Sequence, residues 1–203
     1  MGLENATTVG EIVTHVGILL YGEAFSIEEE TLKTPYKKTF ENFKKKKGKK
    51  GVLVIGQVGS GKSAMMKVYQ RMFKDTERRF KLVKAYELKD MSEEMTTGQI
   101  KEIYGSDLKC DLYIDDIGIN QDAKRYGNTV NIISEIIVDR YELFINAGYR
   151  THFSSNVIAE YKGDINDPKS KMPTLRSLYG GRVLDRIKEM CDIIVFKGTS
   201  LRK

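Results

Sequence analysis

The sequence is poor in features that would cross-link the chain or hold it in a membrane. Its 203 residues include only two cysteines, Cys110 and Cys191, with no CxxC pair and no histidine cluster nearby. We expect two buried thiols, and neither a disulfide framework nor a structural zinc site. The longest apolar run, Val16–Tyr21, is far below the roughly 18 residues that cross a bilayer. The N-terminus lacks the basic flank of a signal peptide, so we expect a cytoplasmic protein with no membrane contact.

Acidic residues do not dominate either, because the chain carries a formal net charge of +6. Much of the excess lies in one basic run, Lys44–Lys50, which is interrupted only by Gly48. A block of like charge is either a solvated linker or a contact for a polyanion such as DNA, and the sequence leaves both open. No aromatic residue lies within the run, so we do not expect base stacking there.

Beyond residue 50, short apolar runs alternate with amphipathic stretches, and no internal repeat is present. We expect strands at residues 52–55, 80–86, 112–114, 149–156 and 192–196, with helices at 62–73, 92–104, 128–146 and 181–190. Gly163–Pro173, with its prolines and polar residues, is expected to be a surface loop. Strands separated by helices predict a three-layer α/β fold with a five-stranded parallel sheet.

Residues 1–50 are predicted to form a short helical N-terminal extension that ends in the basic linker. Ile12, Val13, Val16, Leu19 and Leu20 recur at helical spacing. A second helix is expected from Thr31 to Phe43, entered through Pro35. We therefore divide the chain into this extension, 1–50, and a second domain, 51–203.

One motif identifies that domain as nucleotide-binding. The pattern G-x-x-x-x-G-K-[ST] occurs at Gly56–Ser63, after an apolar strand and before a helix. A glycine-rich turn points successive backbone N–H groups at phosphate oxygens, while Lys62 approaches the terminal phosphates and Ser63 ligates Mg²⁺. Nucleotide contacts are expected from Gly56, Gln57, Val58, Gly59, Ser60, Gly61, Lys62, Ser63 and Ala64. The expected ligands are ATP and Mg²⁺.

A carboxylate pair follows the third predicted strand and completes the expected site. Asp115 should hold Mg²⁺ and Asp116 should polarise the attacking water. Many P-loop hydrolases use glutamate in the second role, and aspartate is a shorter arm.

These and later motifs together resemble one family. Asp111–Gly118 resembles the Walker B segment of the AAA+ ATPases of the DnaC, DnaI and IstB type, which are bacterial helicase loaders and transposition helpers. Ile132–Arg140 looks like their following helix, and Ser154–Asn156 like their sensor 1. Tyr179–Ile187 is similar to their arginine-finger helix, and Gly198–Arg202 to their terminal G-x-S-x-R. The resemblance runs from about residue 51 to residue 202 and implies a P-loop NTPase fold of the AAA+ type.

The resemblance implies further site residues. Asn156 would bind the γ-phosphate or the attacking water, although an asparagine can simply end a strand. Arg186 would be the finger that reaches a neighbouring subunit's nucleotide, with Arg182 as a helper; pairing of Arg186 with a nearby carboxylate is the alternative. Arg202 would sense the nucleotide or lie on the surface. The chain ends after the fifth predicted strand, so no C-terminal lid domain is expected.

The sequence thus predicts a Mg²⁺-dependent ATPase of DNA replication, a helicase loader similar to DnaC. The alternative is a transposition helper similar to IstB, and nothing in the sequence separates the two. A small-molecule kinase would need a basic lid, for which Asp122–Tyr126 is the nearest candidate, and a module that binds without hydrolysing is a further alternative. The GTPase motif N/T-K-x-D is absent. Expected partners are further copies of the chain, a replicative helicase or a transposase, and single-stranded or non-specific DNA.

Overall fold

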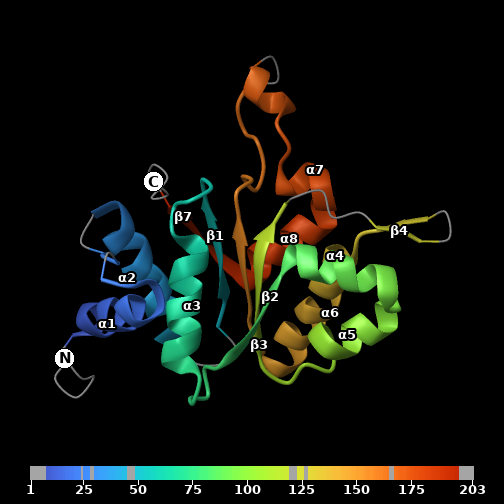
Figure 1. Cartoon of the computed structure of the whole chain (residues 1–203). Coiled ribbons are helices and arrows are strands. Elements are labelled where there is room, and N and C mark those ends of the chain that lie inside the picture. The colour runs from blue at the N-terminus through green and yellow to red at the C-terminus, as the bar shows by residue number, and fades with distance from the viewer. Residues whose placement is uncertain are drawn as a thin grey trace.

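A five-stranded parallel sheet forms the centre of the molecule (Figure 1). The computed structural model describes residues 8–23, 25–27, 30–44, 49–118, 123–125, 128–164 and 167–196. The sheet consists of β1 (Gly51–Gly56), β2 (Phe80–Lys84), β3 (Asp111–Ile117), β6 (Thr151–Ser155) and β7 (Cys191–Phe196). Its order is β2-β3-β6-β1-β7, and every neighbouring pair is parallel. The predicted α/β architecture is therefore confirmed.

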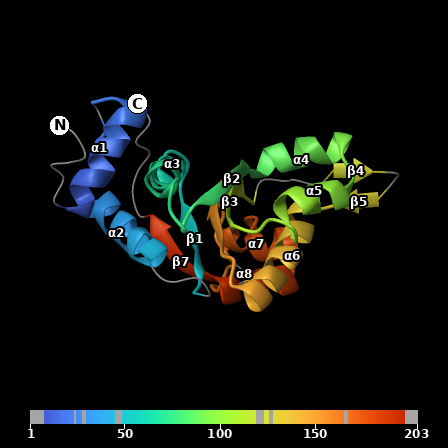
Figure 2. The same cartoon turned by 90° about the horizontal axis from the view of Figure 1, so that it is seen from below.

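Helices cover both faces of the sheet (Figure 2). One face carries α1 (Val9–Tyr21), α2 (Glu30–Lys44) and α3 (Lys62–Phe73); the other carries α4 (Ala85–Glu94), α5 (Thr97–Tyr104), α6 (Ile132–Ala147), α7 (Leu175–Tyr179) and α8 (Gly181–Met190). The period of two along a strand explains both layers. In β1, Val52 and Val54 face α3, whereas Leu53 and Ile55 face the second layer.

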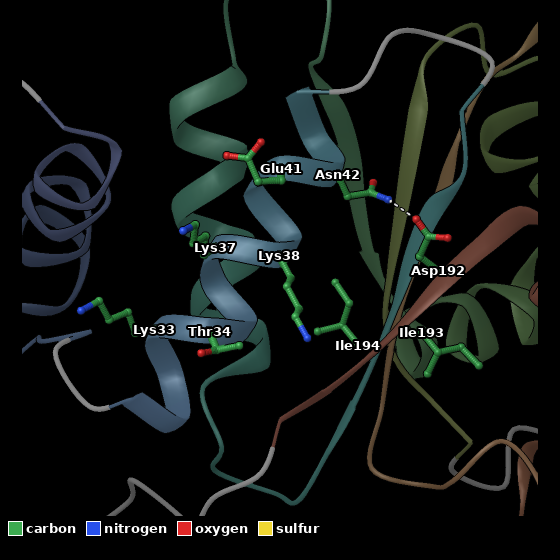
Figure 3. A pocket seen from close by; sticks show the side chains of 9 residues that line it. All are labelled: Lys33, Thr34, Lys37, Lys38, Glu41, Asn42, Asp192, Ile193 and Ile194. Carbon is green, nitrogen blue, oxygen red and sulfur yellow. Dashed lines mark hydrogen bonds between the residues drawn. The ribbon is translucent and has the colours of Figure 1, made fainter.

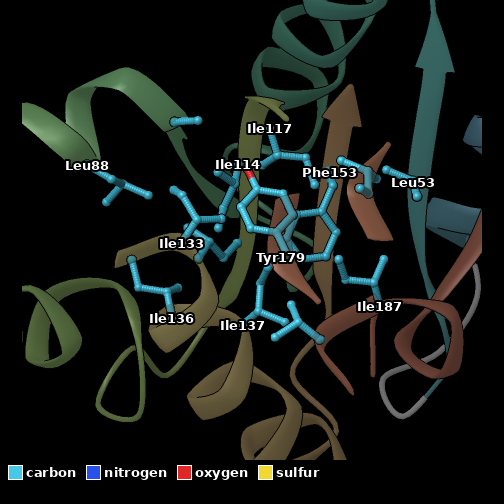
Figure 4. Close-up of a cluster of buried hydrophobic side chains, with 14 of the residues drawn as sticks. Leu53, Leu88, Ile114, Ile117, Ile133, Ile136, Ile137, Phe153, Tyr179 and Ile187 are labelled. Carbon is cyan, nitrogen blue, oxygen red and sulfur yellow. The ribbon is translucent and has the colours of Figure 1, made fainter. Parts of the chain in front are cut away.

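The second layer encloses the larger apolar cluster, which is rich in isoleucine (Figure 4). Ile114 and Ile117 from β3 meet Ile133 and Ile137 from α6, and all four are fully buried. Tyr179 inserts its ring into this cluster, and its hydroxyl accepts a hydrogen bond of 2.8 Å from the backbone N–H of Gly118. Each such burial contributes about 1.5–3 kcal/mol, so the end of β3 is rigidly held.

The N-terminal helices share a core with the helix that follows the glycine-rich loop. Phe43 of α2 is fully buried and stacks on Phe73 of α3 at 5.6 Å and on His152 of β6 at 4.4 Å between ring centroids. Val13 of α1 belongs to the same cluster, whereas Leu19, predicted on the apolar face, is 69% exposed. Helices α1 and α2 thus pack on the same face of the sheet as α3.

Several predicted boundaries are wrong for local reasons. Strand β2 ends at Lys84, because the Glu87 carboxylate accepts the Lys84 backbone N–H at 2.9 Å and begins α4. The single helix predicted for 92–104 is two helices, because Thr96 caps α5 through Gln99. Helix α2 already begins at Glu30, so Pro35 lies inside it.

Three further predictions also need correction. The first residues of the helix predicted from 128 form β5 (Asn128–Val130), which pairs antiparallel with β4 (Ala123–Arg125). Helix α6 starts only after Asn131, whose side chain accepts the Ser134 N–H at 3.1 Å. The predicted loop contains a short 3₁₀ helix, η2 (Pro168–Lys171). Cys191 is buried, but Cys110 lies in the turn before β3 and is partly exposed.

A groove of about 660 Å³ lies between α2 and β7 (Figure 3). Three lysines of α2 line it, Lys33, Lys37 and Lys38, and Asn42 donates a hydrogen bond of 3.0 Å to Asp192 across its end. None of the residues predicted to bind nucleotide lines this groove. The groove therefore lies apart from the predicted nucleotide site.

Candidate functional site

The glycine-rich loop joins β1 to α3 at the edge where the parallel strands end. Gly59 and Gly61 have φ of 82° and 89°, a left-handed region that side chains disfavour. Gly61 directly precedes Lys62, the first residue of α3. The loop therefore leads into the free backbone N–H groups of a helix N-terminus, which attract anions. Gln57 and Val58 are exposed, Ser60 is buried and Ala64 is half-buried on the first turn.

Lys62 is almost fully buried and folds back over this loop. Its ammonium donates to the carbonyl oxygens of Gly56 at 2.7 Å and Gln57 at 2.8 Å, and to Asn156 Oδ1 at 2.7 Å. The hydroxyl of Ser60 lies 3.4 Å from the same nitrogen. A buried charge needs such partners. Phosphate oxygens could replace these neutral acceptors, so the ammonium is placed to change partners.

Asp115 meets three hydroxyl groups at the end of β3. Its Oδ1 accepts hydrogen bonds from Ser63 at 3.0 Å, Tyr113 at 2.5 Å and Ser154 at 2.5 Å. These donors come from α3, β3 and β6, so three elements converge on one carboxylate oxygen. Burial, followed by the charge of Asp115, raises the pKa of Tyr113 well above its usual range. Tyr113 is therefore a neutral donor at neutral pH.

Asp116 and Asn156 connect the ends of β3 and β6. Asn156 Nδ2 donates to Asp116 Oδ1 at 2.5 Å, while its Oδ1 accepts from Lys62. The backbone of Asp116 has φ of 64°, the one left-handed non-glycine residue in the described part of the chain. Its N–H donates to Ser154 Oγ at 2.8 Å. Asn156 thus bridges the lysine of the loop to the second aspartate.

The donor set at this edge suits magnesium. Mg²⁺ takes oxygen ligands and is usually held by one or two carboxylates together with waters and substrate phosphates. The Ser63 hydroxyl and the Asp115 carboxylate touch each other, and both carry oxygen donors only. Ser63 and Asp115 are the residues that would hold the ion beside the phosphates.

The predicted arginines lie apart from this cluster, in the layer opposite α3. Arg182 is exposed on the first turn of α8, and Arg186 is half-buried one turn later. The Arg186 guanidinium lies 5.4 Å from the centroid of the Tyr141 ring. In the described residues, neither arginine contacts Lys62, Asp115 or another carboxylate. Arg202, the terminal motif Gly198–Arg202 and the lysines at 45–48 lie outside the described residues.

Two contributors to the site were not assigned a role from the sequence. Tyr113 stands in an apolar run and resembles a core residue, and Ser154 lies one strand away from the aspartate it contacts. The signal for Tyr113 was its spacing, because residues two apart on a strand share a face. For Ser154, the signal was its place in the Ser154–Asn156 segment that resembles sensor 1, although no role was assigned to the serine itself.

The sheet has the strand order of the AAA+ P-loop proteins. A glycine-rich loop follows β1, and the two aspartates follow β3, which is separated from β1 by the one strand β6. The chain has this fold. No protein-family model matches the sequence, and no curated protein matches it. Similarities are found to solved structures.

The DnaC helicase loader matches with a TM-score of 0.55 and 19% identity over 86% of this chain and 95% of that chain. DnaI matches with a TM-score of 0.55 and 15% identity over 88% of each. AMPPCP-bound DnaA from Aquifex aeolicus matches with a TM-score of 0.57 and 15% identity, over 85% of this chain and 48% of that one. Identities this low show a shared fold. In addition, no helix of the described residues is long and apolar enough to cross a membrane.

Proposed function

We propose that this chain binds ATP with Mg²⁺ at the Gly56–Ser63 loop and hydrolyses it. The observation that carries the proposal is the bridge from Lys62 through Asn156 to Asp116, beside the contact between Ser63 and Asp115. A lysine, a hydroxyl, two carboxylates and an amide from three separate segments meet at one sheet edge. A structural turn has no need of this combination. The AMPPCP bound by DnaA supports a nucleotide in the shared fold.

Each side chain has a role that follows from its chemistry. Lys62 would exchange its carbonyl partners for phosphate oxygens and offset their charge. Asp116 would orient and polarise a water, and Asn156 would hold Asp116 while its own amide faces the phosphate side. Ser63 and Asp115 would bind Mg²⁺, which supplies charge compensation when bound.

The arginines of α8 support an assembled form of the enzyme. Arg186 and Arg182 lie on the layer opposite α3, so a homo-oligomer is the arrangement in which they would serve a site. An arginine supplied by a neighbour stabilises transition-state charge and raises kcat by about 10³–10⁵ in P-loop enzymes. Tyr141 holds Arg186 by a cation–π contact that a neighbour's nucleotide would have to outcompete.

We further propose that the chain acts in DNA replication as a loader of a replicative helicase. The support is the fold shared over nearly the whole chain with DnaC, whose structure is that of a helicase loader, and with DnaI. DNA contact through the Lys44–Lys50 run fits the same role. A transposition helper remains the alternative, and no feature of the described residues favours it.

Steady-state ATP hydrolysis tests the site. Lys62→Ala and Asp116→Asn should each lower the rate by about 10²–10³-fold, because each removes charge stabilisation or water activation in the transition state. The control is Lys67→Ala, which removes an exposed lysine of the same helix and should leave the rate unchanged. Equal rates in wild type and Lys62→Ala would refute the proposed site.

Mixing two inactive variants tests the shared site. Arg186→Ala and Lys62→Ala should each be inactive alone, but their mixture should regain part of the activity, because some interfaces combine an intact Lys62 with an intact Arg186. Arg176→Ala, an exposed arginine of α7, is the control and should stay active alone. Full activity of Arg186→Ala in a dilute monomer would exclude the finger role.

Co-purification from the native cell tests the cellular role. Helicase capture that depends on ATP and is lost in Lys62→Ala supports loading. Capture of a transposase instead would support the alternative.

A further inference from the structure

Tyr113 differs from the other buried tyrosines because its hydroxyl donates a hydrogen bond to a carboxylate of the candidate site, Asp115. Its side chain is fully buried, and its ring meets Phe80 edge-on at 6.3 Å between centroids. Phenylalanine would fill the same apolar space. A buried hydroxyl costs free energy unless it is hydrogen-bonded, and this hydroxyl donates to Asp115 Oδ1 at 2.5 Å. The oxygen of Tyr113 is therefore explained by Asp115 and not by the core.

The donors around Asp115 are distributed unequally over its two oxygens. Tyr113, Ser154 and Ser63 all donate to Oδ1. No hydrogen bond to Oδ2 is found among the residues that the structure describes. Tyr113 and Ser154 belong to the sheet and cannot leave, whereas Ser63 sits on the first turn of α3 beside the phosphate loop. Two fixed donors thus pin one oxygen and determine the direction of the other.

We propose that Tyr113 is a positioning residue, which holds Oδ1 of Asp115 and so fixes the orientation of the carboxylate that, together with Ser63, would bind Mg²⁺. This inference rests on the proposed nucleotide site and deepens it. Ser154 is the second holder of the same oxygen, and it also accepts the N–H of Asp116 at 2.8 Å, so it aligns both aspartates. Partners that orient a metal-binding group typically change metal affinity or activity by about 10–100-fold when removed.

The decisive measurement is the binding of fluorescent mant-ATP as Mg²⁺ is titrated. In Tyr113→Phe, which removes one oxygen, the Mg²⁺ concentration for half-maximal binding should rise about 10-fold or more. Binding in EDTA should match wild type, because Lys62 and the loop are untouched. The hydrolysis rate should recover at high Mg²⁺, a split that a general loss of folding would not give.

Tyr69→Phe is the matched control. Tyr69 is also fully buried, and its hydroxyl donates to the Tyr36 carbonyl at 2.7 Å, away from the site. It should lower the melting temperature without moving the Mg²⁺ midpoint. If Tyr113→Phe proves unstable, Ser154→Ala tests the same oxygen and should shift the midpoint in the same direction.

A midpoint within twofold of wild type in both Tyr113→Phe and Ser154→Ala would overturn the inference, as would an equal shift in Tyr69→Phe. A wild-type protein that binds no mant-ATP at any Mg²⁺ concentration would instead overturn the proposed function, and this inference with it. The wild-type titration therefore separates the two failures.

Discussion

Strand β3 carries a buried aspartate near each end, and their charges are balanced in different ways. Asp111, at the start, binds Arg150 through both oxygens: the backbone N–H at 2.7 Å and the guanidinium Nε at 2.8 Å. Asp115, near the other end, is bound by hydroxyl groups, and no cation pairs with it among the described residues. Residue type, strand and burial are alike. The difference is that the charge of Asp111 is compensated by a cation of the protein, whereas Asp115 accepts hydrogen bonds from hydroxyl groups and could still bind a cation.

The surroundings of Asp111 are closed as well. Arg140 is fully buried and donates to the carbonyl oxygens of Leu108, Cys110 and Arg150 and to the hydroxyl of Thr151, each at 3.0 Å. Burial lowers the pKa of Arg140 to about 10, so it remains charged at neutral pH. Four hydrogen bonds thus hold the Arg140 guanidinium on acceptors of the protein itself.

Neutralising each aspartate in turn tests this contrast most strongly. Asp111→Asn should lower the free energy of unfolding by about 3–5 kcal/mol, because it leaves the Arg150 charge buried without its partner. Asp115→Asn, measured without nucleotide, should cost less than about 1 kcal/mol or stabilise, because it removes a buried charge that forms no direct ion pair with a described residue. Urea denaturation measures both. Similar losses in the two variants would show that the ends of β3 do not differ in this way.

The gain in stability on ligand binding should rank the two variants the other way, because Asp115→Asn should lose most of this gain and Asp111→Asn should keep it. With Mg²⁺ and ATP at 100 times the dissociation constant, wild type should gain about 2.7 kcal/mol of stability, because only the folded state binds. Asp115→Asn should lose most of this gain. Since ligand stabilisation needs no hydrolysis, thermal shifts with a non-hydrolysable analogue suffice. EDTA is the internal control, and a gain that survives it in full would argue against a metal role for Asp115.

The smallest expected effect concerns pH and the closed end. Burial, and then the charges of Arg150 and Arg140, lower the pKa of His152 well below 6.5. Below pH 6.5, His152 is protonated in the unfolded chain but stays neutral in the folded chain. The free energy of unfolding should therefore be highest above this pH and should decrease as the pH falls. The slope is about 1.4 kcal/mol per pH unit.

Urea midpoints between pH 6.5 and 5.5 measure this loss. His152→Asn can keep an acceptor for the Val52 N–H, which donates to His152 Nδ1 at 3.2 Å. It should be less stable overall but show a flatter pH dependence. His15→Asn is the control on the other histidine, and it should retain the wild-type slope. A wild-type slope in His152→Asn would contradict the assignment.

The sequence predicted those parts of the fold where one local pattern dominates. Helix α3 and helix α8 begin and end at the predicted residues, since a motif or a strongly amphipathic run defines them. Ala85 and Tyr86 were placed in a strand although they begin α4, because their apolar character fits both structures and the capping contact between Lys84 and Glu87 decides. Periodicity does not detect such side-chain caps.

The positions of the candidate site residues could be predicted as far as the ends of the strands could. Asp115, Asp116 and Asn156 follow apolar runs, and parallel strands gather their carboxyl ends at one edge. This argument predicts that the three side chains lie close together, but it does not predict their hydrogen-bond partners. It did not give the bond from Asn156 to Lys62, nor the stacking of Arg186 on Tyr141, because both depend on side-chain directions set by the packed sheet.

The backbone of Asp116 has a consequence for how such sequences diverge. At φ of 64°, glycine would relieve local strain on the order of 1 kcal/mol, yet it would delete the carboxylate. Asparagine also tolerates this conformation. Under the role proposed for Asp116, a lineage that no longer needed hydrolysis would thus gain stability by losing this carboxylate, and would still keep the glycine-rich loop proposed to bind phosphate. Among relatives of this chain, the residue at this position would mark which copies turn over nucleotide and which only hold it.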